Sequence, residues 1–313
     1  LAAISSPDYP PDFFTGLITE SDWNDIKNNP DKPLLNRYIQ GTYIPGSIVK
    51  MVTQVSLLNS ETFDKNTKQY CPGFYQFGDR IFGCWYTEGH GELNITEAMA
   101  VSCDVFFYKT VKQIDFEDFY KSFRQFGFGQ KTKIDLPNEA IGLVPNRDYM
   151  IKRYGKYGWS KGVLLNLAIG QGELLVTPLQ ILNYINLLAT KGQSPNCHFV
   201  FVDNLPRNVS PKFSKEIWDN IHLGLREAIT SKNGTGKKAD LNIDGFELYG
   251  KTGTAENPHG DNHAWFVGWV DYYDKKYSIV VLLENAGSGG SVAAPMAKKA
   301  FEKLFLNKNL AQT

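Results

Sequence analysis

Hydrophobic residues recur at helical spacing in the first third of the chain. After Ser47, apolar positions continue to about Leu58 at intervals of three and four residues, which predicts a helix that begins at Ser47. The same spacing predicts two shorter helices over residues 94–101 and 105–114. A polar break at residues 102–104 separates these two helices.

Two further helices are predicted nearer the end of the chain. Thr177 is a typical N-cap residue, Pro178 is favoured at the first helical position and Gly192 is a stop signal. These signals predict a helix that runs to about Thr190. The apolar pattern of residues 292–306 predicts a closing helix.

The last third of the chain changes to a strand pattern. Residues 246–255, 263–270 and 277–283 are rich in β-branched and aromatic side chains, and Gly, Asn and Asp separate them. Helices in the middle and successive strands near the end indicate an α+β domain with an antiparallel sheet.

Other segments lack both patterns. Residues 5–46 are rich in Pro, Asp and Asn and predict a long surface excursion. Residues 59–94 and 127–172 are predicted to be irregular and rich in loops, and Gly-Thr-Gly at 234–236 marks another loop.

Composition excludes some classes of function. The 313 residues are 42% hydrophobic, and 33 basic residues balance 33 acidic residues, so no basic footprint for nucleic acid is present. The chain has no apolar run of the roughly 20 residues that cross a bilayer. It begins at Leu1 without the charged and apolar parts of a signal segment, and an anchor upstream remains an open possibility.

Ser47 and Lys50 form the first cluster of candidate chemistry. Residues three apart on a helix share a face, so the Lys50 amine can reach the Ser47 hydroxyl. Serine becomes a strong nucleophile when a neighbouring base removes its proton, and a desolvated lysine can be that base. A cap serine followed by a surface lysine is the alternative interpretation.

Two more polar clusters follow along the chain. Ser102 and Asp104 lie two positions apart at the helix break, where an ordinary helix cap is the alternative. In Lys251-Thr252-Gly253-Thr254, strand periodicity places both threonine hydroxyls on one face, where they could hold a carboxylate. Gly253 leaves room for a close backbone or ligand, and Lys251 adds a fixed positive charge. The alternative is a strand end with a turn glycine.

In this order, the three clusters are the motif set of penicillin-binding proteins and serine β-lactamases. Pro33–Ser47, Gly170–Gln180 and His263–Gly268 also resemble class B penicillin-binding proteins. The resemblance extends from about residue 5 to residue 305 and is greatest to elongation-type transpeptidases, the penicillin-binding protein 2 group. It implies the penicillin-binding and serine β-lactamase-like fold, an antiparallel sheet flanked by helices with an all-helical region. It also implies a single transpeptidase domain over residues 1–313.

The resemblance implies a role for each motif residue. Ser47 would be acylated by the penultimate D-alanine of a stem peptide, and Lys50 would be the general base. Ser102 would relay a proton to the leaving amine, and backbone N–H groups of Ser47 and Thr254 would form the oxyanion hole. The substrate carboxylate would be held by Lys251, Thr252 and Thr254.

Asp104 departs from the Asn that division-type relatives usually carry at this position. Asn can accept from Lys50 and also donate to a substrate, whereas an ionised Asp only accepts. The part of this role that faces the substrate is therefore in question.

Two other functions share these motifs. A serine β-lactamase would hydrolyse its acyl-enzyme rapidly, usually with an additional base, and no convincing glutamate-bearing loop for that purpose is evident in the sequence. A β-lactam sensor or scaffold domain would not cross-link at all. The resemblance along the chain favours the transpeptidase.

Three of the four cysteines lie in one part of the sequence with a histidine, and these residues are Cys71, Cys84, His90 and Cys103. Three thiolates and an imidazole complete a tetrahedral structural zinc site, although the tight C-x-x-C spacing is lacking. If Ser102 and Asp104 face the active site, Cys103 should point away from it. The alternatives are a Cys71–Cys84 disulfide and simple buried thiols.

The resemblance also implies partners and a location. The substrates would be peptidoglycan stem peptides that end in D-Ala-D-Ala, and β-lactam antibiotics would be inhibitors. A SEDS-type glycosyltransferase and other elongation-complex proteins would bind the full-length protein. The domain would work at the periplasmic face of the inner membrane, held by an N-terminal anchor and a pedestal domain outside this chain.

Overall fold

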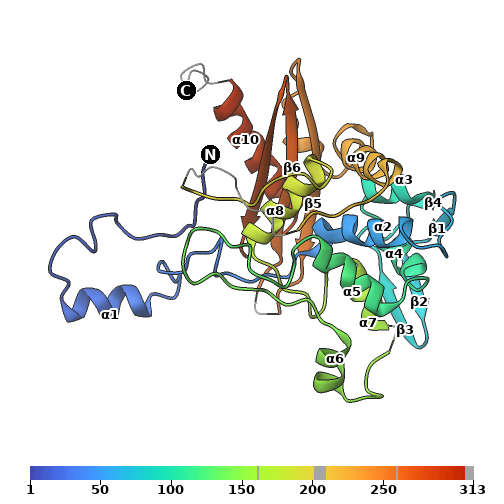
Figure 1. Cartoon of the computed structure of the whole chain (residues 1–313), viewed down its shortest axis with the longest axis horizontal. Coiled ribbons are helices and arrows are strands. Elements are labelled where there is room, and N and C mark those ends of the chain that lie inside the picture. The colour runs from blue at the N-terminus through green and yellow to red at the C-terminus, as the bar shows by residue number, and fades with distance from the viewer. Residues whose placement is uncertain (161, 201–208, 259, 307–313) are drawn as a thin grey trace.

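A three-stranded antiparallel sheet forms where the sequence predicted strands (Figure 1). The computed structural model of the chain describes residues 1–160, 162–200, 209–258 and 260–306. The strands of this sheet are adjacent in sequence and pair in the order β5-β6-β7, and they are β5 (Phe246–Ala255), β6 (His263–Tyr272) and β7 (Lys275–Leu283). The antiparallel sheet and the α+β class are therefore confirmed.

The middle strand β6 is buried on both faces of the sheet, because its apolar side chains point to each face in turn. Phe266 and Val270 join a core with the closing helix α10 (Ala294–Phe305). Trp265, Val267 and Trp269 face the opposite way, into the larger core of the helical region. Period-2 alternation thus links two cores through one strand.

The predicted central helices are also present. Their bounds are α2 (Lys50–Leu58), α3 (Ile95–Ala100), α4 (Asp104–Val111) and α8 (Pro178–Ala189). The Thr177 hydroxyl caps α8 by accepting a hydrogen bond from the Gln180 N–H, and the Gln180 side-chain oxygen accepts one from the Thr177 N–H. The Thr-Pro signal was therefore sufficient for this helix.

Helices that the sequence analysis did not predict complete the described fold. They are α1 (Glu20–Asn28) within the exposed N-terminal excursion, α5 (Phe116–Gln125), α6 (Arg147–Tyr154), α7 (Gly162–Ala168) and α9 (Lys215–Thr230). Of two short helical turns, the π-helical η3 (Gly289–Ala293) packs against the sheet, and η2 (Lys237–Ala239) packs against α10 and α9. In Figure 1, α6 projects at the end of the molecule opposite to α10.

The segment 59–94 is more regular than predicted. It contains two antiparallel pairs, β1 (Gln69–Cys71) with β4 (Gly91–Leu93) and β2 (Phe74–Phe77) with β3 (Arg80–Gly83). These pairs pack beside α4 (Figure 1). No helix in the described ranges combines the length and apolarity needed to cross a membrane.

Candidate active site

Ser47 lies on a short 3-10 turn, η1 (Gly46–Val49), and the α-helix α2 begins only at Lys50. The turn is wedged between two other backbones. A Cβ atom at Gly46 would lie 2.7 Å from the Thr254 carbonyl oxygen, and one at Gly170 would lie 2.1 Å from the Gly46 oxygen. Only glycine permits these approaches, so β5 and the loop at residues 170–173 both touch the turn of Ser47.

Lys50 is fully buried, and its Nζ atom has three oxygen partners. It donates to the Ser102 carbonyl at 2.8 Å, the Ser102 hydroxyl at 3.2 Å and Asp104 Oδ1 at 2.7 Å. Three acceptors match the three N–H bonds of an ammonium group. The half-buried Ser47 hydroxyl forms no hydrogen bond with the described residues, so Lys50 is hydrogen-bonded to the second motif and not to Ser47.

The second motif, Ser102 to Asp104, is held in a strained loop between α3 and α4. Ser102 has a φ of 57°, in the left-handed region that serine rarely occupies. This conformation lets Ser102 present both its carbonyl and its hydroxyl to Lys50. Strain of this kind is retained where the surroundings fix the backbone for a function.

Asp104 bridges two donors. Its Oδ1 atom accepts from Lys50, and its Oδ2 atom accepts from the backbone N–H of Trp85 at 3.1 Å. The Trp85 indole N–H also donates to the Val101 carbonyl at 3.0 Å, so Trp85 contacts both sides of the loop. An amide NH₂ in place of Oδ2 would meet the Trp85 N–H. A residue that only accepts hydrogen bonds therefore fits at this position. Both carboxylate oxygens of Asp104 already accept hydrogen bonds from other protein groups.

Lys251 lies on the face of β5 opposite to Thr252 and Thr254. It is fully buried, it pairs in register with Val267, and its Nζ atom donates to the Thr252 carbonyl at 3.2 Å. Burial, together with the nearby positive charge of Lys50, lowers the pKa of Lys251 well below its usual value. Lys251 therefore belongs to the same buried cluster as Lys50 and Asp104, and its charge is less fixed than the sequence suggested.

Gly253 does allow the close approach that its position predicted. A Cβ atom there would lie 2.8 Å from Ile48 Cγ2 and 3.1 Å from the Pro45 carbonyl oxygen. The missing side chain is what brings the Ser47 turn onto the strand.

Three residues at the site were missed in the sequence. Thr252 donates its hydroxyl hydrogen bond to Thr235 Oγ1 at 2.8 Å, so the Gly-Thr-Gly loop reaches the third motif. The Gln171 amide donates to the Thr254 carbonyl at 3.3 Å. Trp85 is the third. Gly-Thr-Gly and Gly-Gln-Gly are visible sequence signals for two of them, but their partners are distant in sequence.

The four candidate metal ligands converge behind the second motif. One potential ligand atom from each of Cys71, Cys84, His90 and Cys103 lies within 4.8 Å of every other. Cys103 is fully buried, and its Sγ atom lies among the ligand atoms of this cluster. All four cysteines of the chain are described and are free thiols, so Cys71 and Cys84 are not bonded to each other.

The spacing of these atoms suits a tetrahedral zinc ion. At a tetrahedral angle, Zn–S bonds of about 2.3 Å and Zn–N bonds of about 2.05 Å give a sulfur–nitrogen separation of about 3.6 Å. His90 Nδ1 lies 3.7 Å from Cys71 Sγ and 3.5 Å from Cys84 Sγ. The hydrogen bond between the two thiols lowers the pKa of Cys84 and raises the pKa of Cys103, so it favours the thiolate form that metals bind at Cys84 alone.

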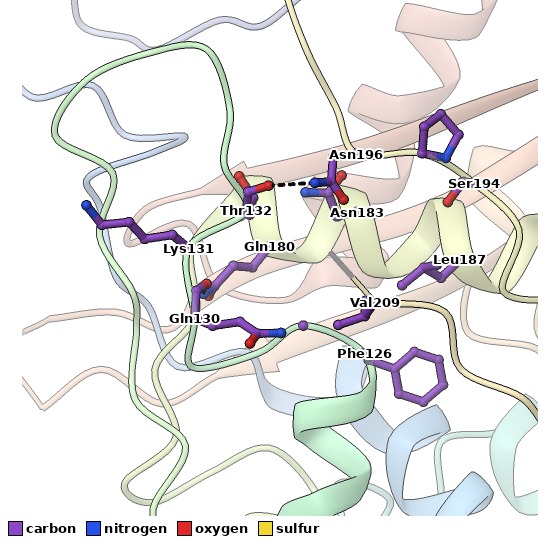
Figure 2. A pocket seen from close by; sticks show the side chains of 12 residues that line it. Phe126, Gln130, Lys131, Thr132, Gln180, Asn183, Leu187, Ser194, Asn196 and Val209 are labelled. Atoms are coloured by element: carbon purple, nitrogen blue, oxygen red, sulfur yellow. Dashed lines mark hydrogen bonds between the residues drawn. The ribbon is translucent and has the colours of Figure 1, made fainter. Parts of the chain in front are cut away.

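A separate small pocket lies away from these residues. Figure 2 shows it between α8, the segment at residues 126–132 and the chain around Asn196, which donates to the Thr132 carbonyl at 3.0 Å. Its volume of about 20 Å³ is close to that of a single water molecule. It is too small for a stem peptide.

Comparison with protein families gives a match over nearly the whole chain. Residues 1–302 match the family described as penicillin binding protein transpeptidase domain. The chain is 30% identical to peptidoglycan D,D-transpeptidase MrdA of Haemophilus influenzae, over 100% of this chain and 52% of that protein. It is 32% identical to MrdA of Acinetobacter baumannii, over 98% of this chain and 49% of that protein. The chain thus spans about half the length of these curated relatives.

Solved structures agree in fold. Penicillin-binding protein PBP2 from Helicobacter pylori superposes with a TM-score of 0.87 at 35% identity, over 96% of this chain and 57% of that one. The complex of that protein with MreC gives a TM-score of 0.87 at 34% identity, over the same shares. Pseudomonas aeruginosa PBP2 in complex with WCK 5153 gives 0.88 at 30% identity, over 97% and 70%.

Proposed function

The chain belongs to the penicillin-binding protein transpeptidase family, and from this premise we propose that it is a D,D-transpeptidase that cross-links peptidoglycan stem peptides. The observation that carries the proposal is the meeting of three motifs from distant parts of the chain. The turn of Ser47 packs against β5 and leads directly into Lys50, Lys50 pairs with Asp104, and the charges of that pair act on the buried Lys251 of β5.

The chemistry follows from this arrangement. Ser47 Oγ attacks the carbonyl carbon of the penultimate D-alanine while the Lys50 amine, which must be in its neutral form for this step, accepts the hydroxyl proton. The C–N bond then breaks, and the terminal D-alanine leaves with a proton relayed through Ser102. The amine of a second stem attacks the acyl-enzyme, forms the new amide bond and returns Ser47 to its hydroxyl form.

The three acceptors around Lys50 suit this cycle. They stabilise the protonated amine, which is the product of the first proton transfer. The missing hydrogen bond to Ser47 is compatible with this role, because catalytic hydrogen bonds often shorten only when the substrate is bound.

β-Lactams would be inhibitors, because they would acylate the same serine. Incubation with penicillin followed by intact mass spectrometry should give one adduct per chain, and peptide mapping should locate it at Ser47. The Ser47→Ala variant should give none. Ser56→Ala is a matched control on α2, since that hydroxyl only bonds the Val52 carbonyl, and it should keep the adduct. An adduct that maps elsewhere, or that persists in Ser47→Ala, would refute the mechanism.

A β-lactamase or a sensor is the alternative reading of the same motifs. Glu173 is the glutamate beside the Gln171 loop, and both of its oxygens accept from tyrosine hydroxyls, those of Tyr149 and Tyr154. A carboxylate held in this way is poorly suited to activate a hydrolytic water. A stable penicillin adduct would separate a transpeptidase from a β-lactamase, and cross-linking of a stem peptide would separate it from a sensor.

The location and partners form part of the proposal. We place the activity at the periplasmic face of the inner membrane, together with a SEDS-type glycosyltransferase and other elongation proteins. The support is the solved complex of Helicobacter pylori PBP2, which is 34% identical to this chain, with MreC. Co-purification of the full-length protein with these partners from membranes is the test, and recovery of the protein without them would count against it.

We also propose that Cys71, Cys84, His90 and Cys103 hold a structural zinc ion. The ion would neutralise the thiolates and fix the loop of Cys84 to the back of the second motif. No step of acyl transfer involves it. The support is the donor set, its burial and sulfur–nitrogen distances near those of a tetrahedral site.

Elemental analysis of protein purified without added metal tests this proposal. About one zinc per chain is expected, and chelation should lower the melting temperature markedly, because structural zinc can supply roughly 10 kcal/mol of folding free energy. Cys71→Ser should lose the metal. Cys197→Ser is a matched control, since Cys197 is the cysteine outside the cluster. Metal-free protein with Cys71 and Cys84 oxidised to each other would refute the site.

A further inference from the structure

A basic and aromatic segment is tied by hydrogen bonds to Glu173, in the loop at residues 170–173 that borders the candidate active site. Residues 147–160, here named the α6 lobe, contain four basic residues and one acidic residue in a chain whose net charge is zero. The basic residues are Arg147, Lys152, Arg153 and Lys156. The lobe comprises α6 and the turn that follows it, and Figure 1 shows it extending away from the rest of the molecule.

The lobe exposes its aromatic and cationic side chains together. Every residue from 151 to 158 is exposed, and Tyr157 is 90% exposed. Lys156 Nζ lies 5.5 Å from the centre of the Tyr157 ring, and the Arg153 guanidinium lies 5.8 Å from that of Tyr154. An aromatic ring this exposed is not part of the core, so both of its faces are accessible to a ligand.

The lobe is nevertheless fixed to the body of the protein. Met150 is fully buried, and the hydroxyls of Tyr149 and Tyr154 both donate to the Glu173 carboxylate. Arg153 lies 3.8 Å from the same carboxylate. A rigid anchor under an exposed surface is the arrangement expected of a preorganised binding site.

The residue that anchors the lobe, Glu173, lies close in sequence to a contact with the third motif, Lys251 to Thr254. Glu173 is two residues from Gln171, whose amide donates to the Thr254 carbonyl. The same loop contacts the turn of Ser47 through Gly170. A polymer ligand bound on the lobe would therefore lie next to the part of the candidate active site that this loop forms.

We propose that the α6 lobe binds the uncross-linked peptidoglycan strand that brings the acceptor amine, an inference that rests on the proposed transpeptidase function. An uncross-linked stem keeps at least its terminal carboxylate, and a strand repeats that charge along its length. Exposed Lys and Arg complement such carboxylates, and tyrosine rings can pack against the C–H faces of sugars. Each contact is weak, and repetition along a polymer makes the sum effective.

The donor strand is the less suitable occupant. Its terminal carboxylate is the one that Thr252 and Thr254 would hold, and this carboxylate departs with D-alanine when the acyl-enzyme forms. The acceptor must then be collected and held near the acyl carbon without help from that pocket. A basic surface next to the Gln171 loop meets that need.

The double variant Lys152→Glu with Lys156→Glu tests the proposal. Both side chains are exposed and neither forms an ion pair within the described part of the chain. We expect the KM for glycan strands as acceptors to rise about tenfold, equivalent to about 1.4 kcal/mol. Acylation by penicillin should stay unchanged, because that reaction uses no acceptor. The matched control is Lys299→Glu with Lys303→Glu, two exposed lysines on α10, and it should leave both quantities unchanged.

A second variant separates stacking from charge. Tyr157→Ser keeps every cation and removes the exposed ring, and about a threefold rise in the same KM is expected for a solvent-exposed ring contact. Raised salt should weaken strand binding by the wild type more than by the charge-reversed double variant.

The outcomes are distinguishable. An unchanged acceptor KM with intact acylation overturns the lobe proposal and leaves the transpeptidase proposal standing. Absence of penicillin acylation in the wild type would instead refute the proposed function. If the double variant binds strands normally but no longer binds vesicles of anionic phospholipid, the lobe is a membrane-contacting surface and the proposal is wrong.

Discussion

The two lysines of the candidate site are both fully buried, but their surroundings differ. Lys50 Nζ donates to three oxygens, one of them the Asp104 carboxylate. Lys251 Nζ donates to one backbone carbonyl and forms no ion pair with the described residues, while the charge of Lys50 lies nearby. The oxygens around Lys50 stabilise a positive charge on its side chain, whereas burial and the nearby charge of Lys50 destabilise a positive charge on Lys251.

This difference suggests a division of labour. A group that carries a proton must be stable in its protonated form, and the environment of Lys50 provides that stability. Lys251 can influence the site through a charge that burial makes easy to lose. The sequence had already assigned proton transfer to Lys50, but it indicated a fixed charge at Lys251, because motif spacing contains no information on burial.

The largest effect is expected from replacing each lysine with arginine. Lys50→Arg should lower the second-order rate of acylation by about 10²- to 10⁴-fold, because arginine does not give up its proton at working pH. Lys251→Arg should lose much less if that residue transfers no proton. Stopped-flow acylation with a chromogenic β-lactam measures both, with melting temperatures as a check on folding. Equal losses of the acylation rate would show that Lys50 and Lys251 have the same role in the reaction.

Asp104→Asn should have the next largest effect, on stability. It removes the charge that partners Lys50 and places an amide NH₂ beside the Trp85 N–H. We expect the free energy of unfolding to fall by about 1.5 to 3 kcal/mol, the range for hydrogen bonds to charged groups. Urea denaturation measures it. Asp118→Asn, which breaks the exposed pair with Lys121, is the control and should change little. A stable Asp104→Asn variant would mean that Lys50 does not depend on this carboxylate.

The sequence predicted those elements whose signals are local. β5, β6 and β7 have clear alternation, and the Thr177 cap defined α8. The strands β1 to β4 were missed because they are only three or four residues long, and Tyr70 and Ile81 within them are exposed. Their stability comes from pairing and from contacts with α4, which no short window contains.

α6 was missed for a different reason. Met150 is its one buried residue, so it has no apolar stripe to produce a helical period. Its end signals are present, with Asn146 as the N-cap and Gly155 after the last turn. A search for caps alone would have found it.

The candidate site was predicted in its residue types but not in its partners. Ser47, Lys50, Ser102, Asp104 and Lys251 follow from motifs in the right order. The Trp85 N–H is a backbone group, so no residue type announces it, and the bond from Thr252 to Thr235 depends on how the Gly-Thr-Gly loop packs. Such contacts are set by tertiary packing.

The pH dependence of stability gives a smaller test of the Lys251 environment. Its pKa is lowered in the folded protein, whereas an unfolded lysine has a pKa of about 10.4. Between these values the unfolded chain binds more protons, so this residue makes stability rise with pH, by at most about 1.4 kcal/mol per pH unit. The advantage of Lys251→Met over wild type should therefore be greatest at low pH and shrink as the pH approaches about 10. A constant difference across this range would mean that Lys251 keeps its proton in the folded protein.

The smallest effect is expected at Thr252, on the face of β5 opposite to Lys251. Thr252→Val keeps the β-branched shape but removes the hydroxyl that bonds Thr235 and would contact the substrate carboxylate. For donors with a carboxylate, acylation should weaken by about 1 kcal/mol, the net value of one hydrogen bond. Thr235→Val, which removes only the partner of that hydroxyl, should give a smaller loss of the same kind. A carboxylate-free acyl donor should react equally well with both variants and with wild type, as measured by the same stopped-flow assay. Equal losses for the two types of donor would mean that the Thr252 side of the site also affects proton transfer, and the contrast between Lys50 and the β5 residues would no longer describe the site.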